Sequence, residues 1–211
     1  MRKLFLATFS IALGATLAAQ TVDRIAAVID QQVLTVTEVG QMATIRFFPR
    51  DAGQTEDGYR EDILEALIAQ TLRLRDVERF GAPDVTADTI EARLLEIQGR
   101  FASPEEFQAA MARAELTLDD VRALIRRQLQ VEIYIQERFA PLLFIANEEV
   151  EAYYRDEWTR QRRGRGLAVP PLDTVRDEVR QALHAKRLTE ETDRWTQRLR
   201  LRADVDVYAW R

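Results

Sequence analysis

The segment that decides the fold is residues 22–39, which read VDRIAAVIDQQVLTVTEV. Alternate positions from Ile25 to Ile29 are apolar in the manner of a half-buried strand, and a β-branched run follows at 33–36. The pair Gln31-Gln32 separates the two runs and is a weaker turn former than Asn-Gly, so a turn wider than two residues is expected. The segment therefore predicts a β-hairpin near the start of the chain.

Helices are predicted on the carboxy-terminal side of this hairpin. Thr37 is expected to cap a first helix that runs to about Phe48, and a polar, glycine-containing loop follows at 49–58. From Tyr59 to Phe139, apolar residues recur at spacings of three and four, which predicts a series of amphipathic helices. The expected helices cover residues 59–80, 86–97, 103–111 and 117–139, with N-caps at Thr86, Ser103 and Thr117.

The last third of the chain is also predicted to be helical. Asn147 is expected to cap a helix that ends near Gln161, and a longer helix follows from Asp173 to about Ala203. Basic and glycine residues followed by Pro170-Pro171 mark residues 161–172 as a linker. The long helix carries an apolar stripe at helical spacing, formed by Val175, Val179, Ala182, Leu188, Trp195 and Leu199.

The chain ends in a short alternating strand, Val205–Tyr208. An isolated strand of this length is not stable, so it needs a partner. The hairpin offers one, through the alternating residues Ile25, Ala27 and Ile29. The sequence therefore predicts a mainly α fold with a small β element that joins the two ends of the chain.

The amino terminus predicts a secretory signal peptide over residues 1–19. Arg2 and Lys3 form a positive head, residues 4–17 are largely apolar, and Ala18 and Ala19 supply small residues for cleavage. The apolar stretch is shorter than the ~20 residues that a spanning helix needs, so an uncleaved anchor is the less favoured alternative. We expect export to the periplasm and a mature protein that is not embedded in the membrane.

Composition excludes several classes of function. Loss of Arg2 and Lys3 leaves 28 basic against 35 acidic residues, a net charge of about −7, which argues against a nucleic-acid partner. The chain has no cysteine, so neither a disulfide framework nor a thiolate metal site is available. His184, the single histidine, is expected to be a solvated helix residue, which leaves no metal site and no catalytic triad. We predict a protein without enzymatic activity, cofactor or metal.

Several stretches of the chain, taken in order, match one known family. They are residues 22–29, 33–39, 63–68, 107–126, 147–154 and 171–179. This order resembles that of the SurA-type periplasmic chaperones. In that family the stretch similar to residues 147–154 leads into a parvulin-type prolyl isomerase domain, and the stretch similar to residues 171–179 follows that domain.

The resemblance stops where the isomerase would lie. Only 13 residues separate Trp158 from Leu172, whereas a parvulin domain needs on the order of a hundred. Parvulin sites also use a pair of histidines, and this chain has only His184. The resemblance thus implies the chaperone core without the isomerase. The implied division is a signal peptide (1–19), a SurA-N-like helical domain (20–160), a linker in place of the parvulin domain (161–172) and a helix and strand that complete the core (173–211).

The resemblance implies a holdase for unfolded outer-membrane, secreted or other envelope proteins. Such binding requires a concave apolar surface with adaptable side chains. Large and soft candidates on the first and middle helices are Met42, Phe47, Phe48, Phe101, Phe107 and Met111. The sequence leaves open whether these six are ordinary core residues. It also leaves open a scaffold subunit that binds one dedicated partner, and self-association into a homodimer through the same surface.

Overall fold

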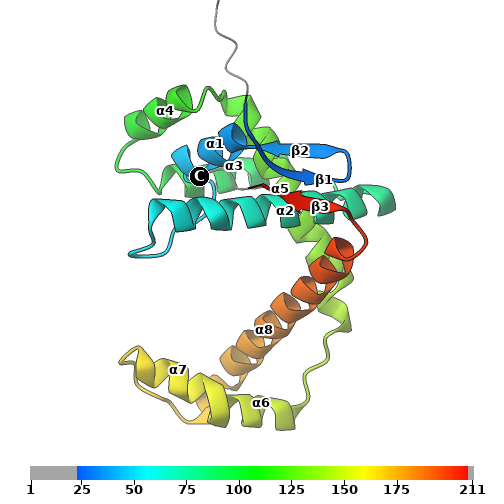
Figure 1. Cartoon of the computed structure of the whole chain (residues 1–211). Coiled ribbons are helices and arrows are strands. Elements are labelled where there is room, and N and C mark those ends of the chain that lie inside the picture. The colour runs from blue at the N-terminus through cyan, green and yellow to red at the C-terminus, as the bar shows by residue number, and fades with distance from the viewer. Residues whose placement is uncertain (1–22, 209–211) are drawn as a thin grey trace, which may run out of the picture.

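The computed structural model describes residues 23–208, and residues 1–22 and 209–211 lie outside the described part. The predicted signal peptide, including Ala18 and Ala19, therefore falls outside the described residues. The described part is mainly α-helical with a small antiparallel sheet, which confirms the predicted fold class (Figure 1).

The sheet brings together the two ends of the described chain. Its strands are β1 (Ile25–Ile29), β2 (Gln32–Thr35) and β3 (Val205–Val207), in the order β2-β1-β3 with both pairs antiparallel. Ile29 pairs with Gln32, so the hairpin turn consists of Asp30 and Gln31 and is narrower than the sequence predicts. Asp30 permits this turn because it takes a left-handed φ of 52°, which aspartate tolerates better than most residues.

A β-bulge in β1 changes which side chains face the core. The pairing shifts between Ile25 and Ala27, which inserts one extra residue into β1. Ala26 and Ala27 are consequently both buried, whereas Ile25 is 45% exposed. The expected alternation, with Ile25 on the same face as Ala27 and Ile29, is therefore wrong at its first position.

The first helix, α1 (Val36–Thr44), begins and ends earlier than predicted. Thr35, not Thr37, is its N-cap: the Thr35 hydroxyl accepts a hydrogen bond from the backbone N–H of Glu38, and the Glu38 carboxylate accepts one from the N–H of Thr35. The helix stops because Arg46 adopts a left-handed φ of 50° and Phe47 N–H bonds back to the Met42 carbonyl, the pattern of a Schellman C-cap.

The helices of the middle of the chain follow the sequence signals closely. The hydroxyls of Thr86, Ser103 and Thr117 each accept a hydrogen bond from a backbone N–H in the first turn of the following helix, which confirms these caps. The elements in chain order are α2 (Glu56–Phe80), α3 (Ala87–Gln98), α4 (Pro104–Arg113), α5 (Leu118–Arg138) and the 3-10 helix η1 (Ala140–Leu142).

The helix near residue 147 differs from the prediction at both ends. Ala146, not Asn147, occupies the N-cap position, and its N–H donates to the Glu149 carboxylate. The helical path then runs through α6 (Asn147–Tyr153), the π-helix η2 (Tyr154–Trp158) and α7 (Thr159–Gly164) before α8 (Leu172–Arg200) begins. The irregular part of the expected 161–172 linker is therefore shortened to residues 165–171.

The described chain forms a head and an arm (Figure 1). The head contains the sheet and α1–α5, with a large apolar core. The arm contains α8, which runs away from the head, and α6, η2 and α7 near its far end; α6 and η2 pack against α8 through Val150, Trp158 and Val179. A third cluster, Val77, Val131 and Trp195, fixes α8 to α2 and α5 at the junction. No helix of the described residues is long and apolar enough to cross a bilayer.

Polar contacts also tie the carboxy-terminal strand to the hairpin. Asp204 N–H donates to the Asp30 carboxylate at 2.8 Å, and Asp30 N–H donates to the Asp204 carbonyl at 2.7 Å. The other carboxylate oxygen of Asp30 accepts a 2.6 Å hydrogen bond from Arg75 on α2. The apolar stripe of α8 is thus divided: Val175, Val179 and Ala182 pack within the arm, whereas Trp195 and Leu199, together with these polar contacts, attach the last helix and strand to the head.

Candidate functional site

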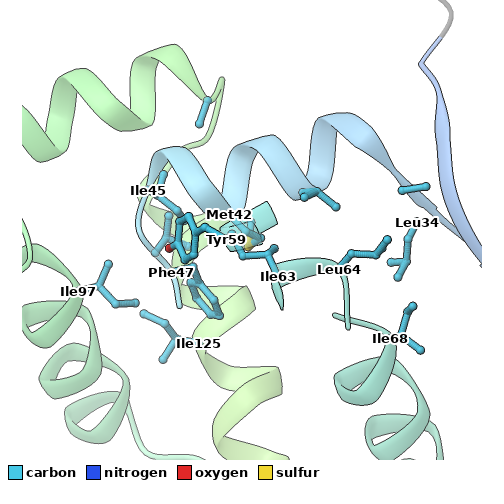
Figure 2. Close-up of a cluster of buried hydrophobic side chains, with 14 of the residues drawn as sticks. Leu34, Met42, Ile45, Phe47, Tyr59, Ile63, Leu64, Ile68, Ile97 and Ile125 are labelled. Carbon is cyan, nitrogen blue, oxygen red and sulfur yellow. The ribbon is translucent and has the colours of Figure 1, made fainter. Parts of the chain in front are cut away.

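The six residues proposed from the sequence divide into two groups. Met42, Phe47, Phe107 and Met111 are 2–8% exposed and belong to the core of the head. Figure 2 shows Met42 and Phe47 inside this cluster, near Tyr59 and Ile63. Phe48 and Phe101 are only partly buried and pack at the edge of the same core. The sequence left open whether the six are ordinary core residues, and four of them are packed as core residues.

Three of the six nevertheless line one hollow in the head. This hollow, which we call the apolar hollow, has a volume of about 290 Å³ and lies between β2, α1, α2 and α5. Its apolar lining is Leu34, Met42, Phe47, Phe48, Leu67, Leu74 and Leu124. Its polar lining is Gln32, Glu38, Gln70, Thr71, Arg75, Glu78, Arg127 and Gln128. A concave apolar floor with mixed polar groups is the usual composition of a binding site.

Phe48 also lines a second hollow, of about 450 Å³, beside the loop that follows α1. Its ring packs edge to face on Phe47, with centroids 5.2 Å apart. A hydrogen bond fixes the backbone of the loop, because the Tyr59 hydroxyl donates to the Phe48 carbonyl at 2.7 Å. Burial raises the pKa of Tyr59, so the phenol stays protonated and remains a donor. Phe48 is therefore a fixed aromatic ridge between two hollows.

Two arginines complete the attachment of this loop. Arg100 donates to the carbonyls of Arg46 and Phe47, and Arg46 donates in turn to the carbonyl of Arg100. The Arg46 guanidinium also lies over the ring of Phe101, 4.5 Å from its centroid. Phe101 is thus covered by a cation and offers less apolar surface than Phe48.

Gln70 is the residue of the apolar hollow that the sequence did not single out. Its side-chain nitrogen Nε2 is buried and finds no hydrogen-bond acceptor among residues 23–208, whereas Gln128 on the same hollow donates to Glu132. A buried donor without an acceptor is destabilising, and native structures contain few of them. One sequence signal could have identified it: Gln70 occupies the stripe of α2 that contains Ile63, Leu67 and Leu74, where a polar residue is out of place.

His184, expected to be fully solvated, is half-buried. Its Nε2 lies 3.2 Å from the carbonyl of Ala140, because α8 packs beside η1 at this point. Within the described residues no cluster of histidine, cysteine, aspartate or glutamate side chains has the arrangement of a metal site.

Comparison with known proteins gives one consistent result. No protein-family model matches the chain. Among curated proteins, the chain is 28% identical over 146 residues to Chaperone SurA of Pseudomonas fluorescens (strain Pf0-1). The chain is similar to the SurA chaperones. The SurA chaperone of Alkalilimnicola ehrlichii is 27% identical over 191 residues, or 83% of this chain, and that of Bordetella avium is 25% identical over 142 residues, or 65%.

The similarity covers most of this chain but a minority of its relatives. The matched regions make up 34% of the Pseudomonas fluorescens SurA, 43% of the Alkalilimnicola ehrlichii SurA and 28% of the Bordetella avium SurA. The chain thus spans well under half of the length of these curated relatives. In the part that the structure describes, α7 passes into α8 through residues 165–171 alone.

Proposed function

We propose that the protein is a chaperone that holds unfolded outer-membrane or other envelope proteins at the apolar hollow of its head. The observation that carries this proposal is the buried Gln70 amide without an acceptor, beside the aromatic ridge of Phe48. The similarity to SurA chaperones supports the same class of activity.

The two kinds of surface suit a client of any sequence. Phe48, Leu67 and Leu74 are only partly buried in the lining and offer apolar contacts, which favour any apolar side chain of the client. A client that displaces the side chains covering it can accept a hydrogen bond from the buried Gln70 amide through a backbone carbonyl, a group that every residue carries. Binding through such contacts is weak and tolerant, as a holdase requires.

We further propose that the protein acts in the periplasm after removal of residues 1–19, and that the mature chain does not catalyse prolyl isomerisation. The first part is supported by the composition of the amino-terminal segment. The second is supported by the short connection between Trp158 and Leu172 and by the single histidine. Purified protein should leave the exchange of proline peptides at its uncatalysed time of tens of seconds. A faster exchange would refute the proposed lack of prolyl isomerase activity.

The test of the client site uses two variants and a matched control. Phe48→Ser should weaken binding of an unfolded outer-membrane protein by roughly tenfold, because full burial of an exposed phenylalanine contributes ~1.5–3 kcal/mol and Phe48 is already partly buried before the client binds. Phe144→Ser is the control, since Phe144 is 82% exposed on the arm and lies outside the apolar hollow. Binding is measured by fluorescence anisotropy of a labelled client, and suppression of aggregation by light scattering.

Gln70→Leu gives the sharper result. The change removes a buried donor that has no acceptor, so stability should stay equal or rise by about 1 kcal/mol while client binding weakens. A loss of stability without a loss of binding would give Gln70 a structural role and refute the proposed site. Use of several unrelated unfolded clients separates a general holdase from a scaffold, which would retain a single dedicated partner.

A further inference from the structure

Another hollow lies at the junction of head and arm, and neither the sequence motifs nor the similarity to SurA assigns it a role. It has a volume of about 420 Å³ and sits where α2, α5 and α8 end. We call it the junction hollow. Its lining is Asp76, Arg79, Phe80, Tyr134, Arg138, Phe139, Trp195, Arg198, Leu199 and Arg202.

The junction hollow carries unpaired positive charge. Arg79, Arg138 and Arg202 are exposed and form no ion pair with a carboxylate in the described part of the chain. Arg198 is the exception, because it pairs with Glu191 at 3.2 Å. The one acid of the lining, Asp76, accepts a hydrogen bond from the Trp195 indole. This local excess of arginine contrasts with the acidic balance of the whole chain.

The floor of the junction hollow is aromatic. Tyr134 stacks on Trp195 with ring centroids 5.7 Å apart, and Phe139 packs on the same indole at 5.3 Å. Phe80 at the end of α2 is 67% exposed beside them. Arginine, tryptophan and tyrosine are the residues that dominate the energetic centres of protein interfaces. The surface thus offers stacking area and cationic groups together.

The helix ends around the hollow favour carboxylates over phosphate groups as the bound anion. The carboxyl ends of α2, α5 and α8 carry partial negative charge, and the last-turn arginines offset it. Phosphate groups in proteins favour the opposite end of a helix, where free N–H groups point at the anion. Single carboxylates can instead pair one by one with separate guanidinium groups, which present planar forks of donors.

We propose that the junction hollow binds a polypeptide segment in which carboxylates alternate with aromatic side chains. The carboxylates pair with Arg79, Arg138 and Arg202, and an aromatic ring rests against Phe80 and the Trp195 cluster. A neighbouring hollow of about 250 Å³ shares Asp76, Arg79, Leu199 and Arg202 with it, which lengthens the surface along α8. This inference does not rest on the proposed holdase function, because it concerns different residues.

The test uses the fluorescence of Trp195 in the full mature chain. Trp158→Phe and Trp210→Phe leave Trp195 as the sole tryptophan. The probe is a synthetic peptide of alternating Glu and Phe, and its matched control replaces each Glu with Gln. The first peptide should change the Trp195 emission saturably, and its binding should weaken as salt rises.

The arginines are then replaced and compared with a charge-matched control. Arg79→Gln, Arg138→Gln and Arg202→Gln together should raise the Kd roughly tenfold. Arg113→Gln, Arg126→Gln and Arg163→Gln remove the same charge elsewhere and should change it less than about twofold. The three corresponding Arg→Lys changes keep the charge and serve if the glutamine variant does not fold; they should weaken binding less, because lysine lacks the bidentate fork.

Three results would overturn the proposal. One is equal binding of the Glu and Gln peptides, which would remove the role of carboxylates. Another is an equal loss in the two triple variants, which would reduce the effect to net charge. The last is binding of inorganic phosphate, or of vesicles of phosphatidylglycerol, at least as tightly as the peptide and with the same dependence on Arg79, Arg138 and Arg202. Failure of the Phe48→Ser and Gln70→Leu tests would leave this outcome unaffected.

Discussion

Replacement of Trp195 by alanine removes the side chain that fixes α8 to the head. Trp195 is 6% exposed and packs with Val77 and Val131 at the junction. Its indole stacks on Tyr134 and donates a 3.1 Å hydrogen bond to Asp76. The variant therefore loses buried apolar area, a stacked ring and a polar contact at the place where α2, α5 and α8 meet.

The magnitude follows from the burial. A buried tryptophan removes about 150–250 Å² from water, equivalent to about 4–6 kcal/mol at ~25 cal/mol per Å². This figure is an upper bound, because the unfolded chain already buries part of that area. Truncations of this kind cost about 3–5 kcal/mol in other cores, and we expect the same range here. Such a loss rivals the lower end of the ~5–15 kcal/mol that stabilises a typical domain.

The assay is urea unfolding of the full mature chain, followed by far-ultraviolet circular dichroism. Trp195→Phe keeps one ring and loses the N–H, so it should cost only about 1–2 kcal/mol. Gln197→Ala is the surface control, because Gln197 is exposed on the same helix, and it should stay within about 0.5 kcal/mol of the parent. A Trp195→Ala loss no larger than that of Gln197→Ala would refute the role given to the junction cluster.

The remaining predictions concern the stability of the fold at acid pH, the carboxy terminus and the core of the head. The Asp204 N–H and the Arg75 guanidinium hold the pKa of Asp30 below its ordinary value, so its carboxylate stabilises the fold above pH ~4 and loses this effect as the pH falls through the lowered pKa. Melting temperatures should accordingly fall less steeply with acid in Asp30→Asn, and an unchanged slope would contradict this. A chain that ends at Gly166 lacks α8 and β3 and should be insoluble or molten; a cooperative melt near the full-length temperature would count against the shared core. Phe107→Ala should cost about 3–5 kcal/mol in urea unfolding, because Phe107 is 2% exposed, and a loss below ~1 kcal/mol would return it to the surface candidates.

Features that depend on a few neighbouring residues were predictable from the sequence. Thr86, Ser103 and Thr117 cap helices because their hydroxyls meet backbone N–H groups three residues ahead. The strands of the hairpin were predictable from apolar residues at every second position, and the amphipathic helices from apolar residues at spacings of three and four. The strand Val205–Val207 was predictable as well, since an alternating segment too short to stand alone had one evident partner.

The exact start and end of α1 needed more than these local signals. Thr35 and Thr37 are both capable caps, and the structure uses Thr35 because Thr37 instead donates to the Asp23 carboxylate at 2.9 Å. The helix ends at a left-handed Arg46, a conformation that the sequence does not mark with glycine. Which of two equivalent threonines caps the helix therefore depends on contacts with neighbouring segments, here with Asp23.

The candidate site was determined by tertiary structure. The sequence brought Met42, Phe47 and Phe48 forward as large and soft, but only the packing of α1 on α2 and α5 decides that Phe48 remains partly exposed while Phe47 is buried. The Gln70 amide likewise is buried without a hydrogen-bond acceptor only because those helices pack around it. Periodicity identifies the face of a helix that is apolar, whereas exposure depends on whether segments distant in sequence cover that face. Such segments do meet in this fold: Asp30 and Asp204, which are hydrogen-bonded, lie 174 positions apart. The residue types were therefore set by the sequence, and their accessibility by the fold.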